Sequence, residues 1–314
     1  MSGPVSVDDA PAGPAPEEPA SPPCVELTDS HEATVGAMTV RRALPRRSRR
    51  TVGSWCFADH LGPAAVTVDE GVDIGPHPHI GLQTVTWLIA GEILHRDSLG
   101  SEQIIRPGQL NLMTAGHGVS HSEEHTGRYR GELHGAQLWV AQPEATRHGD
   151  AAFEHHAELP RAEIDELTAT VLVGSLGDAA SPARRDTDHL GVSLDLRPGR
   201  SVLPVSAVHE HALVVLAGAV SVDAQLVTPG HLAYLGLGRE ELALDARETA
   251  TALLLGGTPF ESPVLMWWNF VARTREEVDT AQRDWMSGSD RFGAVASPLH
   301  RIPVGPPPWR RAGH

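Results

Sequence analysis

The chain has 314 residues and carries 25 basic against 40 acidic side chains, which gives a formal net charge of −15 at pH 7. This acidity argues against direct binding of nucleic acid, which needs a basic footprint. No apolar run approaches the roughly 20 residues of a membrane-spanning helix. The two cysteines, Cys24 and Cys56, do not make a disulfide framework, so we expect a protein of the reducing cytoplasm.

The N-terminal segment is low in sequence complexity. It is rich in Pro, Ala and Glu and has neither the basic start nor the apolar core of a secretory signal. Such a composition cannot bury enough apolar area to offset the entropy cost of ordering, so we expect a disordered tail over residues 1–35. We interpret the basic run Arg41–Arg50 as a solvated strand and loop rather than a phosphate-binding patch, because a lone basic run is usually surface.

Four potential metal ligands lie in two short motifs. His77 and His79 open the stretch 71–125, and His121 and Glu123 close it, with one residue between the members of each pair. Side chains alternate faces along an extended strand, so the members of each pair point the same way. If the two strands face each other across a small barrel, three imidazoles and one carboxylate converge. That donor set suits a first-row transition metal such as Fe(II), Mn, Ni or Cu.

Short strand-like runs alternate with turns between these motifs. Residues 83–90 (QTVTWLIA) are rich in β-branched and aromatic residues, which favour strands. Gly91-Glu92, Leu99-Gly100 and Pro107-Gly108 are turn signals. This spacing indicates a sandwich or a barrel, and jelly-roll cupins are one solution of that kind.

The order of the motifs resembles a known family. The pattern HPHxGxxTVT, followed by H-x-D-S-x-G, PG and MTAGxGxxHxE, is similar to the pirin family of the cupin superfamily. The same resemblance is carried by five shorter segments: 40–45 (VRRALP), 57–63 (FADHLGP), 133–140 (LHGAQLWV), 254–259 (LLGGTP) and 269–271 (NFV). It covers roughly residues 39–293, nearly all of the chain that is expected to fold.

The resemblance implies an all-β fold of two cupin domains, each a jelly-roll β-barrel, in tandem. It implies one metal ion, Fe(II) first, in the N-terminal domain only, with His77, His79, His121 and Glu123 as ligands. Pirins usually carry Glu where this chain has Gln83. That position is not in the family's ligand set, so metal binding should survive, whereas the metal affinity or the activity of the site can change.

The second half of the chain repeats this order incompletely. His209 and His211 form a pair, but Glu241 and Ala243 stand where the first half has a second ligand pair. We therefore expect a degenerate, structural domain. The expected division is a tail over 1–35, an N-terminal cupin domain with the metal site over 36–150, a C-terminal cupin domain over 151–293 and a Pro-rich tail over 294–314.

A short C-terminal helix is also predicted. Thr274 and Glu277 form a capping-box signature, apolar residues follow at helical spacing, and Gly288 ends the pattern.

Two functions follow from the resemblance. The first is a quercetin 2,3-dioxygenase-like enzyme that takes a small aromatic substrate and O₂, with Glu123 as both metal ligand and catalytic base. The alternative is a non-enzymatic, iron-dependent redox-sensing regulator that binds a partner protein or a transcription complex. A cupin isomerase or storage-like protein is a third class. We expect a monomer without contact to a membrane.

Overall fold

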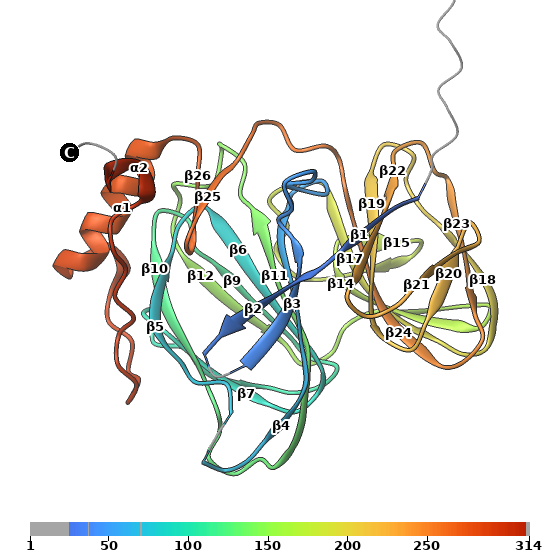
Figure 1. The fold of residues 1–314 in the computed structure, drawn as a ribbon, viewed down its shortest axis with the longest axis horizontal. Coiled ribbons are helices and arrows are strands. Elements are labelled where there is room, and N and C mark those ends of the chain that lie inside the picture. Colours follow the sequence, from blue (N-terminus) through green and yellow to red (C-terminus); the bar gives the residue numbers. More distant parts are fainter. Residues whose placement is uncertain (1–24, 37, 70, 312–314) are drawn as a thin grey trace, which may run out of the picture.

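The computed structural model describes residues 25–36, 38–69 and 71–311. It has two β-sheet lobes side by side, with the helices on the far side of the first lobe (Figure 1). Each lobe contains one seven-stranded and one four-stranded sheet. The expected all-β fold with two tandem barrels and a short C-terminal helix is confirmed. No helix in the described part of the chain is long and apolar enough to cross a bilayer.

The sheets of the first lobe enclose a cavity. The seven-stranded sheet contains, in spatial order, β12 (Ala152–His156), β9 (Leu110–Thr114), β6 (Leu82–Ala90), β11 (Gly131–Ala141), β4 (Trp55–Val66), β3 (Met38–Leu44) and β2 (His31–Val35). The four-stranded sheet contains β5 (Ile74–His79), β10 (Val119–Glu124), β7 (Ile93–Asp97) and β8 (Glu102–Ile105). Strand alternation sorts the side chains of β11: Leu138 faces the second lobe, whereas Gln137 and Trp139 line the cavity.

The second lobe is filled instead of hollow. Its large sheet contains β1 (Glu26–Asp29), β22 (His231–Gly236), β19 (Glu210–Ala217), β24 (Ala250–Gly257), β17 (His189–Leu196), β14 (Leu167–Val173) and β13 (Arg161–Ile164). Its small sheet contains β18 (Gly199–Pro204), β23 (Glu241–Ala246), β20 (Val220–Val222) and β21 (Gln225–Val227), and β15 (Ser175–Leu176) pairs with β16 (Ala179–Ala180). Aliphatic side chains from both sheets, such as Leu213 and Leu242, pack into one buried cluster between them.

The two seven-stranded sheets pack against each other and form the interface between the lobes. One apolar cluster contains side chains of both sheets, among them Leu138 and Val214. Trp55 is fully buried in it, and its indole Nε1–H lies 3.0 Å from the carbonyl oxygen of Leu190 and 3.2 Å from that of Gly256. This residue therefore joins the lobes through packing and hydrogen bonding together.

Both ends of the chain cross between the lobes. Strand β1, which precedes the first lobe, pairs with β22 of the second lobe. The hairpin of β25 (Leu265–Trp267) and β26 (Phe270–Ala272), together with α1 (Arg275–Ser287), η1 (Asp290–Phe292) and α2 (Pro308–Arg311), follows the second lobe but lies against the first (Figure 1). An apolar cluster that joins Ile80 to Trp285 holds these elements there.

The expected domain boundaries differ from the structure at three places. The tail over 1–35 was predicted too long, because β1 and β2 are strands with backbone partners in β22 and β3; residues 1–24 lie outside the described residues. Strand β12 pairs with β9, so the first lobe extends past residue 150. Residues 265–292 were expected in the second domain but pack on the first lobe. Local composition reveals none of these pairings, because an exposed sheet edge accepts any segment that can form a ladder.

The C-terminal segment and helix α1 agree more closely with what the sequence predicts. Residues 294–307 have no helix or strand, as expected for a Pro-rich tail, but they are held on the first lobe: the N–H of Ile302 donates to the carbonyl of Pro76 at 2.9 Å. Helix α1 is confirmed, with Thr274 as its N-cap and Gly288 as its C-cap at φ 73°.

We predict that Trp55→Ala lowers the free energy of unfolding by about 3–5 kcal/mol, because it removes a buried indole from the interface between the lobes. Denaturation with urea measures the change. Leu226→Ala is the control: its side chain is 54 % exposed, and the change should stay within about 0.5 kcal/mol. Equal losses in the two variants would show that Trp55 does not join the lobes.

A pair of buried histidines lies at the edge of the same interface. The Nε2 atoms of His60 on β4 and His134 on β11 are 2.8 Å apart, so one ring donates to the other. His134 also hydrogen-bonds the backbone of Leu216 in the second lobe. Burial, and then the neighbouring His134, lowers the pKa of His60 from 6.5 to about 3.

The buried His60 makes the stability of the protein depend on pH. Between its ordinary pKa of 6.5 and its folded pKa of about 3, His60 binds a proton in the unfolded chain that the folded chain rejects. Stability therefore falls as the pH falls through that window. His60→Gln keeps a hydrogen-bonding group and cannot titrate, so its stability should fall less steeply than that of the wild type. Denaturation curves at a series of pH values test this, and parallel slopes would contradict it.

Candidate metal centre

Three imidazoles converge where β5 pairs with β10. His121 lies directly opposite His77 in the antiparallel register, and His79 is two residues further along β5. One ring nitrogen from each of the three lies within 4.8 Å of the others, and all three side chains are buried. The structure therefore brings together three of the four predicted ligands.

Backbone carbonyl groups fix the outer nitrogen of two rings. The Nδ1–H of His77 donates to the carbonyl oxygen of Gly75 at 2.9 Å, and the Nδ1–H of His79 donates to that of Asn269 at 3.0 Å. A carbonyl only accepts, so each Nδ1 carries the proton and each Nε2 keeps its lone pair. These two rings are thus held in the tautomer that can bind a metal through Nε2.

A chain of side chains on β7 holds the third ring. The Nδ1 atoms of His121 and His95 are 3.3 Å apart, and Nε2–H of His95 donates to the Asp97 carboxylate at 3.1 Å. Burial raises the pKa of Asp97, but hydrogen bonds from His95 and Ser101 outweigh it and hold that pKa below its ordinary value. With its proton on Nε2, His95 presents Nδ1 as an acceptor to Nδ1–H of His121. A carboxylate behind a histidine ligand fixes its tautomer and orientation in this way.

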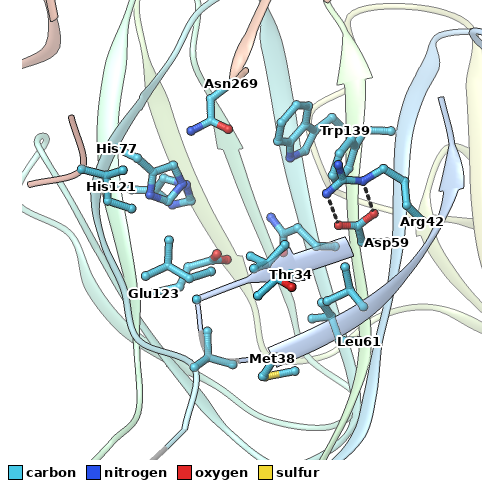
Figure 2. A pocket seen from close by; sticks show the side chains of 18 of the residues that line it. Thr34, Met38, Arg42, Asp59, Leu61, His77, His121, Glu123, Trp139 and Asn269 are labelled. Atoms are coloured by element: carbon cyan, nitrogen blue, oxygen red, sulfur yellow. Dashed lines mark hydrogen bonds and ion pairs between the residues drawn. The ribbon is translucent and has the colours of Figure 1, made fainter. Parts of the chain in front are cut away.

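The fourth predicted ligand, Glu123, lines the same cavity but stands outside the compact group of three rings. Figure 2 shows its carboxylate beside His77 and His121. The residue is buried, and within the described ranges its carboxylate has no hydrogen-bond or ion-pair partner. Burial raises the pKa of Glu123 to about 7. A buried carboxylate without a donor is costly, and a nearby cation would favour its charged form.

The residues present fit a bound cation. Burial lowers the pKa of His77 to about 4 and the pKa values of His79 and His121 well below the usual range, so the rings are neutral at neutral pH. The Nε2 atoms of His79 and His121 are only 3.0 Å apart. Two lone pairs at that distance repel each other unless a positive charge lies between them. The group could therefore hold one divalent transition metal, for which imidazole and carboxylate are suitable donors.

A cavity of about 440 Å³ opens beside these side chains, within the range of small-molecule sites. Phe57 and Trp139 stack on one wall, with ring centroids 4.0 Å apart. Asn269 borders the cavity from above in Figure 2, and its side-chain amide has no partner in the part of the chain that the structure describes. The space next to the rings is thus bounded by aromatic faces and one free amide.

The turn between β25 and β26 brings Asn269 to the site. Trp268, in that turn, has φ 53°, a conformation that is rare for a bulky residue and needs support from its surroundings. Gly81 leaves room for the neighbouring strand β26, since a Cβ there would lie 2.3 Å from the carbonyl oxygen of Val271. The N–H of Val271 donates to the carbonyl of Ile80 at 3.1 Å. The glycine of the HPHxG motif therefore lets the C-terminal hairpin approach the three histidines.

Two family models match the chain. The model described as "Pirin" matches residues 37–140, and the one described as "Pirin C-terminal cupin domain" matches residues 191–293. The chain belongs to the pirin family. A protein of Pseudomonas aeruginosa named "Putative quercetin 2,3-dioxygenase" is 45% identical to this pirin over 279 residues, which cover 88% of each chain.

Solved structures of related proteins have the same architecture. Quercetin 2,3-dioxygenase from Acinetobacter baumannii matches this pirin with a TM-score of 0.88 and 40% identity, over 90% of this chain and 96% of that chain. The Escherichia coli pirin YhhW, solved in complex with nickel(II), matches with a TM-score of 0.60 and 17% identity, over 75% of this chain and 100% of that chain. The second likeness concerns the fold alone.

Three of the residues at the site have no role that the sequence alone assigns. His95 and Asp97 lie two positions apart on one strand face, a spacing that is compatible both with lining the pocket and with ordinary packing. Asn269 belongs to a segment that carries the family resemblance, but its contact with His79 could not be predicted, because the two residues lie 190 positions apart along the chain. Gln83, the departure from the family pattern, is not among the residues that line the cavity; it is buried, and its Nε2 donates to Thr114 Oγ1 at 3.0 Å.

We predict one transition-metal ion per chain in the wild type and its loss in His79→Ala, because the variant removes a donor whose tautomer is fixed for coordination. Elemental analysis of the dialysed proteins measures the metal content. His125→Ala is the matched control, since the Nδ1 of His125 pairs with Asp73 at 2.7 Å outside the cavity. Full occupancy in His79→Ala would refute the assignment.

Proposed function

We propose that this pirin is a metal-dependent dioxygenase of the quercetin 2,3-dioxygenase type. It would cleave the central ring of a flavonol or a related enol with O₂ and release carbon monoxide. The observation that carries the proposal is an unpaired buried carboxylate, that of Glu123, beside three imidazoles in a cavity of about 440 Å³. The names of the Pseudomonas and Acinetobacter relatives support the same activity.

We propose His77, His79, His121 and Glu123 as the ligands of one divalent metal, Fe(II) first, with Mn, Ni or Cu as alternatives. When bound, the metal would supply Lewis-acid and redox chemistry to the substrate enol and to O₂. The histidines contribute neutral donors, because burial and carbonyl partners keep Nε2 unprotonated. His95 and Asp97 are positioning residues that hold the His121 ring.

Glu123 has a second proposed role as general base. Its carboxylate accepts no hydrogen bond from the described residues, so its lone pairs are available for the proton of a substrate hydroxyl near the histidines. A positioned base of this kind contributes about 10²–10⁴-fold to a rate. Phe57 and Trp139 would hold the flat rings of the substrate, and the apolar cluster that contains Val40 and Leu61 would exclude water.

We propose that the second lobe is structural. Its interior is packed with aliphatic side chains. One histidine of its pair, His209, already has a partner: its Nε2 pairs with the Asp188 carboxylate at 3.0 Å. Among the described residues, the compact group of possible metal ligands lies in the first lobe. The large sheet of this lobe instead supports the wall behind the cavity.

We predict that Glu123→Gln retains part of the metal but lowers flavonol turnover by at least about 100-fold, because an amide can coordinate weakly but cannot accept the proton. Quercetin decay, O₂ uptake and carbon monoxide release by Fe-, Mn- and Ni-loaded protein measure this. Glu124→Gln is the control: Glu124 lies on the other face of β10, where Ser122 and Arg96 hold its carboxylate, so that variant should keep its activity.

The same assay separates the enzyme from the redox-sensing regulator. No turnover by the wild type with any of the three metals, across several flavonols, would reject the dioxygenase in favour of the regulator. Wild-type activity that survives Glu123→Gln would keep the enzyme but remove Glu123 as its base.

A further inference from the structure

Alternate residues of two neighbouring strands form the cavity wall that faces the histidines. On β3, Met38, Val40 and Arg42 point inward, and on the neighbouring β4, Asp59 and Leu61 do so. Arg42 and Asp59 lie directly opposite each other in the register of the two strands. Among these inward-facing residues of β3 and β4, Arg42 and Asp59 therefore form a charged pair beside apolar side chains.

The geometry of this pair is specific. Nε and Nη2 of Arg42 each donate to one oxygen of the Asp59 carboxylate at 2.8 Å. Figure 2 shows the pair on the right of the cavity and the histidines on the left. The Asp59 side chain is only 3% exposed, whereas that of Arg42 is 24% exposed. The carboxylate is thus sealed behind a guanidinium that remains accessible.

Hydrogen-bond donors are left over at this wall. Both N–H groups on Nη1 of Arg42 lack an acceptor within the described ranges, because Asp59 takes only Nε and Nη2. Gln137 lines the same wall; its Oε1 accepts from Thr86 Oγ1 at 2.9 Å, and its Nε2 has no acceptor among the residues described. The wall therefore offers donors to a ligand, while its two acceptor groups, the Asp59 carboxylate and Gln137 Oε1, are already bonded.

Two aromatic rings separate the Arg42 guanidinium from the histidines. The guanidinium carbon of Arg42 lies 4.5 Å from the Phe57 ring centroid, and Phe57 stacks on Trp139 at 4.0 Å. Trp139 in turn meets His79 edge-on at 5.2 Å. A ligand atom at Arg42 must therefore belong to a part of the molecule that is well removed from the atoms at the histidines.

A purely structural role explains the pair less well. A buried ion pair contributes little to stability compared with apolar residues of the same size, because desolvation offsets the attraction. Apolar neighbours such as Val40 and Leu61 show that this wall accepts them. Stability alone also does not account for donors that remain unpaired beside an open cavity.

We propose that Arg42, held by Asp59, and Gln137 form a recognition site for phenolic oxygen atoms at the end of the substrate remote from the metal. This inference rests on the proposed function and narrows it: the preferred substrates are polyhydroxylated aromatics with a hydroxyl group on an outer ring, not flavonols in general. Arg42 and Gln137 donate to the phenolic oxygen. Asp59 positions the guanidinium and balances its charge.

Anaerobic ligand binding tests the site without turnover. Metal-loaded protein under argon is titrated with quercetin and with 3-hydroxyflavone, which keeps the 3-hydroxyl and 4-oxo groups but has no outer-ring hydroxyls. Quenching of tryptophan fluorescence reports binding. The wild type should bind quercetin about 10-fold more tightly or better, as expected for hydrogen bonds to a charged group.

The variant Arg42→Gln/Asp59→Asn replaces the ion pair by a neutral pair of similar shape. It should lose that preference for quercetin and bind 3-hydroxyflavone as the wild type does, with unchanged metal content. Arg41→Gln is the matched control, because Arg41 is the neighbour on β3, does not line the cavity and donates to the carbonyl of Gly62. If the double variant does not fold, Arg42→Lys, which keeps the charge but loses the planar fork, should lose the preference.

The outcomes are distinct. A preference that survives in these variants, or is absent from the wild type, overturns the recognition site and leaves the dioxygenase proposal standing. A wild type that prefers quercetin under argon but does not consume it with O₂ supports the recognition site and rejects the dioxygenase. Failure of the wild type to bind either flavonol rejects both.

Discussion

The candidate metal centre depends on one hydrogen bond, from Nδ1 of His79 to the backbone carbonyl of Asn269, two residues that lie 190 positions apart. The bond decides which nitrogen of His79 carries the proton and hence which one faces the cavity. It requires the β25–β26 turn to sit on the first lobe, with Trp268 in a left-handed conformation. Helix α1 and η1 hold that turn in place through the apolar cluster around Phe270.

The lobes are consequently not independent units. Part of the candidate site in the first lobe comes from residues that follow the second lobe, and an edge strand of the second lobe, β1, comes from residues that precede the first. Between them the two large sheets bury Trp55 and the cluster around it. This packing connects the wall behind the cavity to the second lobe, so the second lobe contributes to the geometry of the candidate site in the first.

The centre gathers groups that are costly to bury together. Three neutral imidazoles with facing lone pairs and one carboxylate without a donor occupy a poorly hydrated space. Proteins accept such local conflicts where they serve function, and the surrounding structure compensates for them. Here the compensation is visible in the fixed outer nitrogens and in the chain from His121 through His95 to Asp97.

Sequence by itself determined the strand-rich fold with two barrels, the caps of α1 and the pairing of ligands at i and i+2, because each depends on local periodicity or on residues a few positions apart. It predicted that His77, His79 and His121 converge, and they do so, but from β5 and β10 as hydrogen-bonded neighbours in one sheet and not from two strands that face each other across the barrel. Only the tertiary structure decided that Glu123 stands apart from the rings and that Asn269 fixes His79. The positions of β1, β12 and α1 could not be predicted from the sequence either. A sheet edge or an apolar groove can accept segments from anywhere in the chain, and local sequence patterns do not specify which segment packs there.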